Sequence, residues 1–500
     1  MQLLVSPRKF THAINFPIVL RVVGWLLMIE ALFMIVPLVV SIIYGETKIA
    51  IEFAISVAIT LGAGLVMNHF IRPKSKTMRK REGLLLTATV WIFFSIFGML
   101  PFLFSGTVTN ITDGFFESMS GFTTTGATVI IDVEALPRGV LFWRSMMQWI
   151  GGMGIILFTL AVIPMLNYKG GVSLFNSEVT GITHERMRPR VSQTAKSLWA
   201  IYLVFTVVLA VLLTIGPMDW YDALCHTMST VSTGGFSTKN NGLHFWHDYY
   251  TDIVIIVFMA VCGINFTIIY NVVIRGKFSE FKRSDTLKWY CFVIIFGSVV
   301  VFARIIYMGF VEDKGYAFVL SVFDTISAIT STGFATYDYE HEGQFIFFFL
   351  MLLMFFGGMA GSTAGGAKID RFVVLLKNIK NELYKVVHSN AVTSVRLDGK
   401  SVPHVIVEKV LAFLSIYVAV MVFMAVILTL FGMPAFDAFF NSLSAISNIG
   451  FGYGEMTGGD DKFAMIPGVC KWLLSIEMMI GRLEVFTVLA LLTPSFWKRD

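Results

Sequence analysis

Long apolar runs alternate with short polar stretches along the whole chain. A helix needs roughly 20 apolar residues to cross a bilayer, and several runs exceed this, so we expect tilted, overhanging or broken helices. The first run has no small-residue cleavage site and is interpreted as a retained helix. The pattern predicts ten membrane spans, at residues 18–44, 49–70, 83–105, 145–166, 197–216, 252–274, 287–310, 344–366, 408–432 and 464–494.

Four shorter segments, each about ten residues long and therefore too short to cross, lie among these runs at 112–121, 221–231, 319–329 and 437–446. They predict re-entrant half-helices; ordinary helices at the membrane surface are the alternative. We expect three aspartates to be N-caps, where a carboxylate bonds free amides at the positive helix end. The third segment has Leu320 at the corresponding place, and the three aspartates are Asp113, Asp222 and Asp437.

Each half-helix runs into one copy of a nine-residue motif. Every copy has a hydroxyl residue first, serine third and glycine last, and the final glycines lie 109, 98 and 117 positions apart. Four copies in register, each between a half-helix and a span, predict a ring around an axis, as in internally duplicated membrane proteins. The copies are 118–126, 227–235, 325–333 and 442–450.

The predicted fold is therefore an all-α polytopic membrane protein. Two N-terminal transmembrane helices, residues 1–82, precede four pseudo-symmetric helix–pore-loop–helix repeats. The repeats are expected at 83–196, 197–285, 286–400 and 401–500.

The ends of the motifs suit a dehydrated cation. Neutral backbone carbonyls can replace its water shell without holding it too tightly, and glycine permits the required backbone cheaply. The neighbours are small apart from Ile449. We expect each final glycine and the two residues before it to supply the ligands: Thr124, Thr125, Gly126, Thr233, Gly234, Gly235, Ser331, Thr332, Gly333, Asn448, Ile449 and Gly450.

A polar residue stands nine positions before each final glycine. Such groups are costly inside a membrane and usually face protein. They either brace the half-helices by hydrogen bonds or attract the ion directly, and His226 alone would titrate near neutral pH. The four residues are Glu117, His226, Asp324 and Asn441.

A glycine-rich stretch, residues 357–367, interrupts the span after the third motif. So many glycines disfavour a continuous helix, and broken backbone at membrane depth borders protein or a watery cavity. We expect a gate below the pore; close helix packing through small residues is the alternative, and the phosphate-loop spacing is missing. The gate residues are Gly357, Gly358, Gly361, Ser362, Thr363, Gly365 and Gly366.

Segments that correspond to this glycine-rich stretch follow the first and second motifs. Residues 148–154 hold the matching place in the first repeat and 262–266 in the second, where each could be only a packing face. In the last span, Arg482 and Glu484 either pair with each other or place a charge beside a cation path.

Charge placement sets the expected topology. The chain is 56% hydrophobic, only 14% charged and carries a net charge of +5. Its lysines and arginines crowd residues 72–81, 186–196, 275–288 and 368–385 and the C-terminus, whereas 338–342 and 455–461 are acidic. Positive loops stay cytoplasmic, so ten spans with both termini cytoplasmic agree with the charges better than nucleic-acid binding does. The four cysteines fit neither a metal site nor a disulfide framework.

The chain resembles the Trk potassium-uptake family, specifically its bacterial membrane subunits of the TrkH/TrkG type. The resemblance covers nearly the whole chain and rests on residues 123–128, 148–154, 231–236, 331–334, 361–366 and 447–450. Phe451 and Cys262 depart from residues common in the family, Pro and Gly respectively, without removing a motif glycine.

The resemblance implies a multi-pass protein of the bacterial inner membrane that forms a homodimer, with one potassium pore in each protomer. It implies that 357–367 is the gating loop, that Arg482 sits below the filter, and that a cytoplasmic TrkA-like ring binds nucleotide in place of this chain. Plant relatives that prefer sodium often have Ser where this chain has Gly126, so glycine favours potassium.

These observations favour potassium uptake driven by the membrane potential, which supplies about 2.3 kcal/mol per charge at 100 mV. A sodium-permeable channel or a Na⁺/H⁺-coupled potassium symporter on the same fold is the alternative. A membrane enzyme would need a catalytic constellation, and neither HExxH nor GxSxG occurs in the sequence. We expect a transporter, not an enzyme, with K⁺ as the transported ion, surrounded by membrane lipid and without nucleic acid.

Overall fold

The computed structural model describes residues 14–73, 78–154, 191–309, 311–334, 344–454, 456 and 462–498. Part of the predicted span 145–166, part of the basic loop 186–196 and most of the acidic stretches 338–342 and 455–461 lie outside these residues. The described chain is mostly helical with one short two-stranded hairpin, which confirms the predicted all-α class.

The helices of the first half precede residue 284. In chain order they are α1 (Phe16–Ile43), α2 (Thr47–Phe70), α3 (Lys80–Gly98), α4 (Leu100–Phe104), α5 (Ile111–Phe122), α6 (Arg138–Gly152), α9 (Val191–Ile215), α10 (Trp220–Val231), the 3-10 helix η2 (Gly242–Phe245), α11 (Tyr249–Cys262), α12 (Phe266–Val273) and α13 (Phe278–Arg283).

The second half adds further helices and one small hairpin. Its elements are α14 (Asp285–Met308), α15 (Lys314–Ile329), α16 (Gln344–Met354), α17 (Ile369–Val387), the antiparallel strands β1 (Arg396–Leu397) and β2 (Lys400–Ser401), α18 (His404–Leu430), α19 (Ala435–Ser447), the 3-10 helix η4 (Phe463–Met465), α20 (Gly468–Arg482), α21 (Val485–Leu492) and α22 (Pro494–Trp497).

Six helical segments are long and apolar enough to cross a membrane within the described residues: α1, α2, α3 with α4, α9 from Lys196, α14 and α18. A seventh is obtained if α11 and α12, bent by 103° at a short break, count as one span. The chain is thus a multi-pass helical membrane protein, whereas the count of ten spans stays a prediction.

The spans predicted after the four motifs are not continuous helices, in line with the broken helices expected for such long runs. The run 344–366 is helical only to Met354, and 252–274 bends between Cys262 and Phe266. The run 464–494 breaks between Arg482 and Val485, and α6 ends at Gly152. Glycine or a residue with positive φ lies at or shortly after each of these four helix ends. The helix therefore stops there, although the apolar sequence continues.

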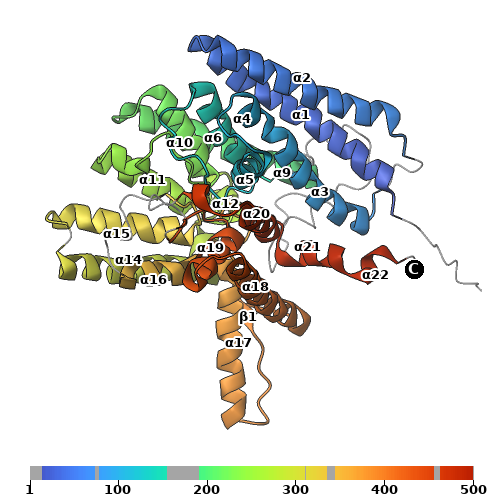
Figure 1. Cartoon of the computed structure of the whole chain (residues 1–500). Helices are drawn as coiled ribbons and strands as arrows, with labels where there is room; N and C mark the ends of the chain where they lie inside the picture. The colour runs from blue at the N-terminus through green and yellow to red at the C-terminus, as the bar shows by residue number, and fades with distance from the viewer. Residues whose placement is uncertain are drawn as a thin grey trace, which may run out of the picture.

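The two N-terminal helices lie side by side along one edge of the molecule (Figure 1). Gly24 of α1 and Gly64 of α2 face each other, and a Cβ atom at Gly64 would lie 2.7 Å from the Gly24 carbonyl oxygen. Small residues let helix backbones approach closely where the solvent is lipid. The two helices therefore pack as a pair, and α1 also contacts α3 and α6.

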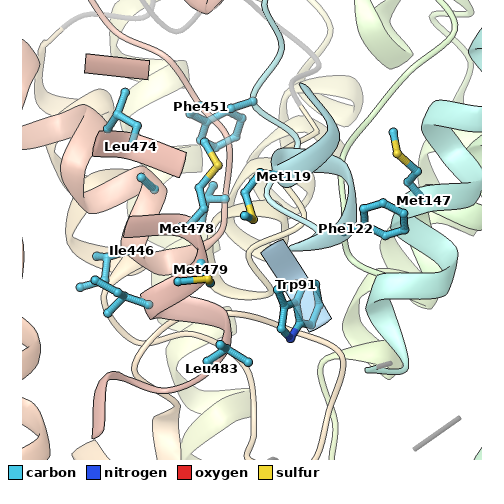
Figure 2. Packing of buried hydrophobic residues seen from close by; sticks show 14 of the residues in the cluster. Trp91, Met119, Phe122, Met147, Ile446, Phe451, Leu474, Met478, Met479 and Leu483 are labelled. Atoms are coloured by element: carbon cyan, nitrogen blue, oxygen red, sulfur yellow. The ribbon is translucent and has the colours of Figure 1, made fainter. Parts of the chain in front are cut away.

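Apolar side chains fill the space between the first and last parts of the chain. Figure 2 shows Leu474, Met478 and Met479 of α20 on one side, with Met119 and Phe122 of α5 opposite them. All five are buried, which joins α20 to α5 although some 350 positions separate them. This packing therefore joins the first short helix, α5, to the last part of the chain.

Helices α5, α10, α15 and α19 lie at the four predicted segments, whereas their re-entrant placement stays a prediction, and the predicted N-caps were wrong. Asn110, Asp219 and Asp313 cap the first three, accepting from the amides of Asp113, Asp222 and Gly315 at 2.8, 2.7 and 2.8 Å. The fourth starts after Pro434. Asp113, Asp222 and Asp437 instead lie in the first turn, because each helix begins earlier than the apolar pattern indicates.

Candidate functional site

The four short helices end in the same backbone turn. Two residues before each final glycine, at Thr124, Thr233, Ser331 and Asn448, the amide donates to the carbonyl three residues earlier, at 3.0–3.3 Å. The next amide donates to the carbonyl of the third motif residue, a serine in every copy, at 2.7–3.0 Å. This pair of bonds is the Schellman arrangement that ends many helices. The backbone carbonyl of the motif serine accepts one of the two bonds in every copy.

The backbone angles repeat as well. The residue two before the glycine has φ of 55°, 53°, 51° and 53°, and the glycine itself 86°, 83°, 75° and 87°, in chain order. Positive φ is unusual for a β-branched residue such as Thr124 or Thr233 and costs about 1–3 kcal/mol. The surroundings hold this strain at equivalent positions in all four segments.

The four glycines meet in a closed ring. A Cβ atom at Gly126 would overlap the carbonyl oxygen of Gly234, and one at Gly235 that of Thr332. A Cβ atom at Gly333 would overlap the carbonyl oxygen of Ile449, and one at Gly450 that of Thr125. Each glycine thus lies against the carbonyl just before the glycine of the next segment. Glycine is required here by close backbone approach as well as by its positive φ.

Side chains connect neighbouring segments of the ring. Asn448 donates from Nδ2 to Thr125 Oγ1 at 3.0 Å and to the Met478 carbonyl at 2.9 Å. Gln148 of α6 donates from Nε2 to the Gly234 carbonyl at 2.6 Å and accepts from the Phe236 amide at 3.1 Å. Sequence reasoning missed Gln148 as a contact of the second motif, having considered 148–154 only as a pore-adjacent break or packing face.

Three of the polar residues nine positions before the glycines brace the chain just beyond the ring. Glu117 accepts from Thr128 and the Val129 amide at 3.0 Å each. His226 bonds to Ser237 at 2.9 Å, and Asn441 exchanges two bonds of 3.2 Å with the backbone of Tyr453. The bracing interpretation is confirmed for these three; the fourth, Asp324, is also fully buried.

A buried ion pair joins the first and second segments. Arg144 of α6 lies 2.8 Å from Glu117 and donates to the Ser237 carbonyl at 3.2 Å, while its guanidinium stacks 4.2 Å from the Phe236 ring. Both charged side chains are at most 2% exposed. Arg144 therefore satisfies the carboxylate of one segment and fixes the backbone that leaves the ring in the next. The sequence does not reveal this pairing, because the two residues are on different helices.

The glycine-rich stretch lies against the ring from one side. The Gly365 amide donates to Ser331 Oγ, and the Gly366 amide donates to the Ser447 carbonyl at 2.9 Å. A Cβ atom at Gly365 would overlap that same carbonyl oxygen. Thr363 Oγ1 contacts the Val231 carbonyl at 3.2 Å. Contacts reach the second, third and fourth half-helix ends, so residues 357–367 cover this side of the ring.

The stretch is also bonded to the bend between α11 and α12. The Met359 amide donates to the Gly263 carbonyl at 2.9 Å, and the Phe266 amide to the Gly361 carbonyl at 3.0 Å. Asn265 donates from Nδ2 to the Ala360 carbonyl at 2.6 Å. Two broken spans thus satisfy each other's backbone groups, as required of irregular backbone at membrane depth.

The charged side chain of Arg482 also bonds to the glycine-rich stretch. Arg482 donates to the Thr363 carbonyl at 3.0 Å and to the Gly151 and Gly152 carbonyls at 2.7 and 3.1 Å. Glu484 pairs with Arg371 at 2.7 Å, so the interpretation that Arg482 and Glu484 pair with each other was wrong. Arg482 instead connects α20, the end of α6 and the glycine-rich stretch.

Lys368 and Arg371 belong to the basic residues that the charge pattern assigns to a cytoplasmic loop, and both are buried. Lys368 donates to the Ala364 carbonyl and Arg371 to the Ala367 carbonyl, and the Asp370 carboxylate accepts from the Ala360 amide at 2.6 Å. These three residues anchor both ends of the glycine-rich stretch.

The arrangement of the ring is suited to a cation. Four helix C-termini, each with about half a negative charge, end at one ring of closely spaced carbonyls and glycines. The described residues contain no group of three or more His, Cys, Asp or Glu side chains that could hold a metal ion. Fold and site together define a polytopic helical membrane protein with the features of a cation transporter.

Comparison with known proteins agrees. The chain matches the TrkH family, described as cation transport proteins, over residues 47–499. It is 34% identical over 491 residues to the Trk system potassium uptake protein TrkH of Escherichia coli K12, covering 97% of this chain and 100% of that protein. It is 33% identical over 484 residues to TrkG of the same organism, covering 96% and 98%.

A solved structure is similar along the whole length. The crystal structure of the potassium transporter TrkH from Vibrio parahaemolyticus superposes with a TM-score of 0.86 at 32% identity, covering 97% of this chain and 100% of that one. The chain belongs to the TrkH family of cation transport proteins. This is a family of transport proteins and not of enzymes, and the resemblance inferred from the motifs is confirmed.

Proposed function

We propose that this chain takes up potassium across the bacterial inner membrane, through a filter formed by the ring of motif ends. The observation that carries the proposal is the ring itself, in which four equivalent glycines each lie against a carbonyl of the next segment. The relatives named above are potassium uptake proteins, which supports K⁺ as the ion. The membrane potential supplies about 2.3 kcal/mol per charge at 100 mV.

In this proposal the chain has ten spans with both termini cytoplasmic, and it consists of the two-helix region 1–82 followed by repeats 83–196, 197–285, 286–400 and 401–500. The final two motif residues and the residue before them supply carbonyl ligands in each repeat. The matched backbone angles of the four segments support the repeat assignment. The protein acts as a homodimer, and a cytoplasmic TrkA-like ring, not this chain, binds the regulatory nucleotide.

Residues 357–367 and Arg482 form the gate. The stretch is bonded to the ring by Gly365, Gly366 and Thr363, so potassium can pass only when these bonds break. Thr363→Val removes the hydroxyl contact with the second half-helix and should raise potassium leak into liposomes in the absence of a partner. Ser362→Ala is the matched control, because that hydroxyl donates within the stretch, to Met359 at 2.6 Å.

The decisive experiment is rescue of a potassium-auxotrophic bacterium at low external potassium, with and without a TrkA-like partner. Gly126→Ser should raise sodium permeability relative to potassium in liposome flux. An unchanged permeability ratio would count against the filter assignment. Failure to rescue, together with sodium flux by the unmodified protein, would instead favour a sodium-permeable channel. Potassium uptake that requires a sodium or proton gradient would favour a Na⁺/H⁺-coupled potassium symporter.

A further inference from the structure

Glu477 lies in α20 beside the fourth half-helix, and its carboxyl group is completely buried. Its Oε1 is 2.6 Å from Ser442 Oγ, and its Oε2 has no hydrogen-bond partner within the described part of the chain. Glu477 takes part in none of the ion pairs formed by the described residues. It is thus a buried acid without a cation, in contrast to Glu117.

The partner hydroxyl determines where the proton lies. Ser442 Oγ is 2.9 Å from the Met421 carbonyl of α18 as well as 2.6 Å from Glu477. A hydroxyl has one proton to donate, and a carbonyl can only accept. When Ser442 donates to Met421, Glu477 must donate to Ser442. A neutral carboxylic acid satisfies both contacts, whereas a carboxylate leaves one of them without a proton.

The burial of Glu477 also favours the neutral acid. An ion taken out of water without a partner costs several kcal/mol, and a single hydrogen bond to a charged group returns only about 1.5–3 kcal/mol. We infer that Glu477 is a proton-binding site: in the folded protein it is the neutral acid, donating to Ser442, which in turn donates to the Met421 carbonyl. The ligand of the site is the proton.

The first repeat has a neutral side chain at the same place. Helices α6 and α20 both follow a proline and have 15 residues each, so Met147 and Glu477 are both the tenth residue. Met147 Sδ lies 3.7 Å from Ser118 Oγ, and Ser118 and Ser442 are both the first residue of a motif. One helix thus presents a thioether to the motif hydroxyl and the other presents a carboxyl, which indicates that this position does not need a charge.

Other ionisable groups on neighbouring elements have their own contacts. On α18, the Tyr417 hydroxyl is 2.7 Å from Ser447 Oγ. On α5, Asp113 pairs with Lys471 of α20, and Glu117 pairs with Arg144. Further groups are Asp437 in the first turn of α19, Arg482 at the end of α20 and Glu484, paired with Arg371, before α21. The start of α18 carries His404 and Glu408, which pair with each other, and Lys409.

The protonated form matters for transport if the proposed filter is correct. Asn448 donates to the carbonyl of Met478, the residue after Glu477, so the acid lies behind the fourth segment of the ring. A fixed negative charge there would hold a cation more strongly than neutral carbonyls do, and conduction needs ligands that release the ion. Glu477 is accordingly a positioning residue and not an ion ligand.

Infrared spectroscopy tests the inference without measuring transport. We expect the spectrum of the purified protein minus that of Glu477→Gln, at neutral pH, to contain a protonated-carboxyl C=O band that shifts in deuterated buffer. Ser442→Ala should move this band to higher frequency without removing it, because the bond to the hydroxyl is lost. If the glutamine variant does not fold, Glu477→Met, which copies Met147 of the first repeat, serves as the subtracted variant.

A difference spectrum that contains carboxylate bands in place of the protonated C=O band would overturn the inference. So would a protonated band that is unaffected by Ser442→Ala. Neither outcome depends on potassium flux, so the proton site and the proposed function can fail separately.

Discussion

Gly450 lies directly against Thr125: a Cβ atom on the glycine would overlap the Thr125 carbonyl oxygen. This contact joins the last motif of the chain to the first and closes the ring. It fixes the position of two backbones that are 325 residues apart in sequence. A substitution that disturbs this contact should therefore affect the whole ring.

Gly450→Ala should reduce potassium flux by at least about tenfold, equivalent to about 1.4 kcal/mol, because the new methyl group must displace a ring carbonyl. The measurement is potassium flux into liposomes together with thermal unfolding. Gly432→Ala is the control, since Gly432 has a similar φ of 92° but no heavy atom within 4 Å of the Cβ position. Equal losses in the two variants would mean that backbone strain alone, and not the ring contact, causes the effect.

Gln148→Leu should weaken selectivity and lower the unfolding temperature. It leaves the Phe236 amide and the Gly234 carbonyl without their side-chain partner, and an unsatisfied buried group costs about 1–3 kcal/mol. Gln148→Glu keeps the acceptor for Phe236 but loses the donor to Gly234, so it separates the two bonds. The potassium-to-sodium flux ratio and thermal unfolding would be measured. A Leu variant that matches the parent in both would show that α6 does not support the ring.

The Glu117–Arg144 pair should behave as a coupled unit. Removing one partner leaves an uncompensated buried charge, which costs about 3–5 kcal/mol. We expect Arg144→Met or Glu117→Gln alone to destabilise the protein strongly, and the double variant to recover part of the loss. The measurement is a double-mutant cycle of unfolding in detergent. Additive effects would show that the 2.8 Å contact contributes no coupling.

Lys377 should stabilise the protein in a pH-dependent way. It bonds at 2.6 Å to Asp285, which precedes the apolar run 287–310. The Asp285 carboxylate also accepts from the Asp398 amide at 3.2 Å. Protonation removes the charge of this carboxylate, so the stability that the pair contributes is present above the ordinary aspartate pKa of about 3.9 and is lost in stronger acid.

Lys377→Met should therefore lower the unfolding temperature at pH 7, and the difference should shrink in acid. Lys385→Met is the control, because its partner Glu382 lies three residues away on the same helix and this pair is more exposed than the Lys377–Asp285 pair. Such exposed pairs contribute little. A difference between parent and Lys377→Met that is independent of pH would contradict the assignment to Asp285.

The four helix-ending turns could be located from the sequence because the final glycine and the serine of each belong to one nine-residue segment. The positive φ of Thr124 and Thr233 and the serine carbonyl that accepts in each turn were not predicted. The helix starts were less predictable: the caps Asn110 and Asp219 precede the apolar pattern, and Asp113 and Asp222 compete for the same role. Either carboxylate suits the positive end of a helix.

Contacts between distant segments could not be predicted in this way. Gln148, Arg144 and Glu477 are polar residues within apolar helices, and only the packing of α6 and α20 shows which backbone or hydroxyl each one meets. Lys368 and Arg371 follow the glycine-rich stretch in a basic sequence, which is also typical of a solvated loop. Their burial depends on the fold around the break and not on local composition.

The bend between α11 and α12 exchanges hydrogen bonds with residues 359–361. Residues 359–361 therefore cannot move without breaking these hydrogen bonds. Displacing them strips amides and carbonyls of their partners on two chain segments at once, and in a hydrocarbon interior only incoming water can replace those partners. In the proposed gate, opening therefore requires water to enter between these two segments, so solutes that lower water activity should keep it shut.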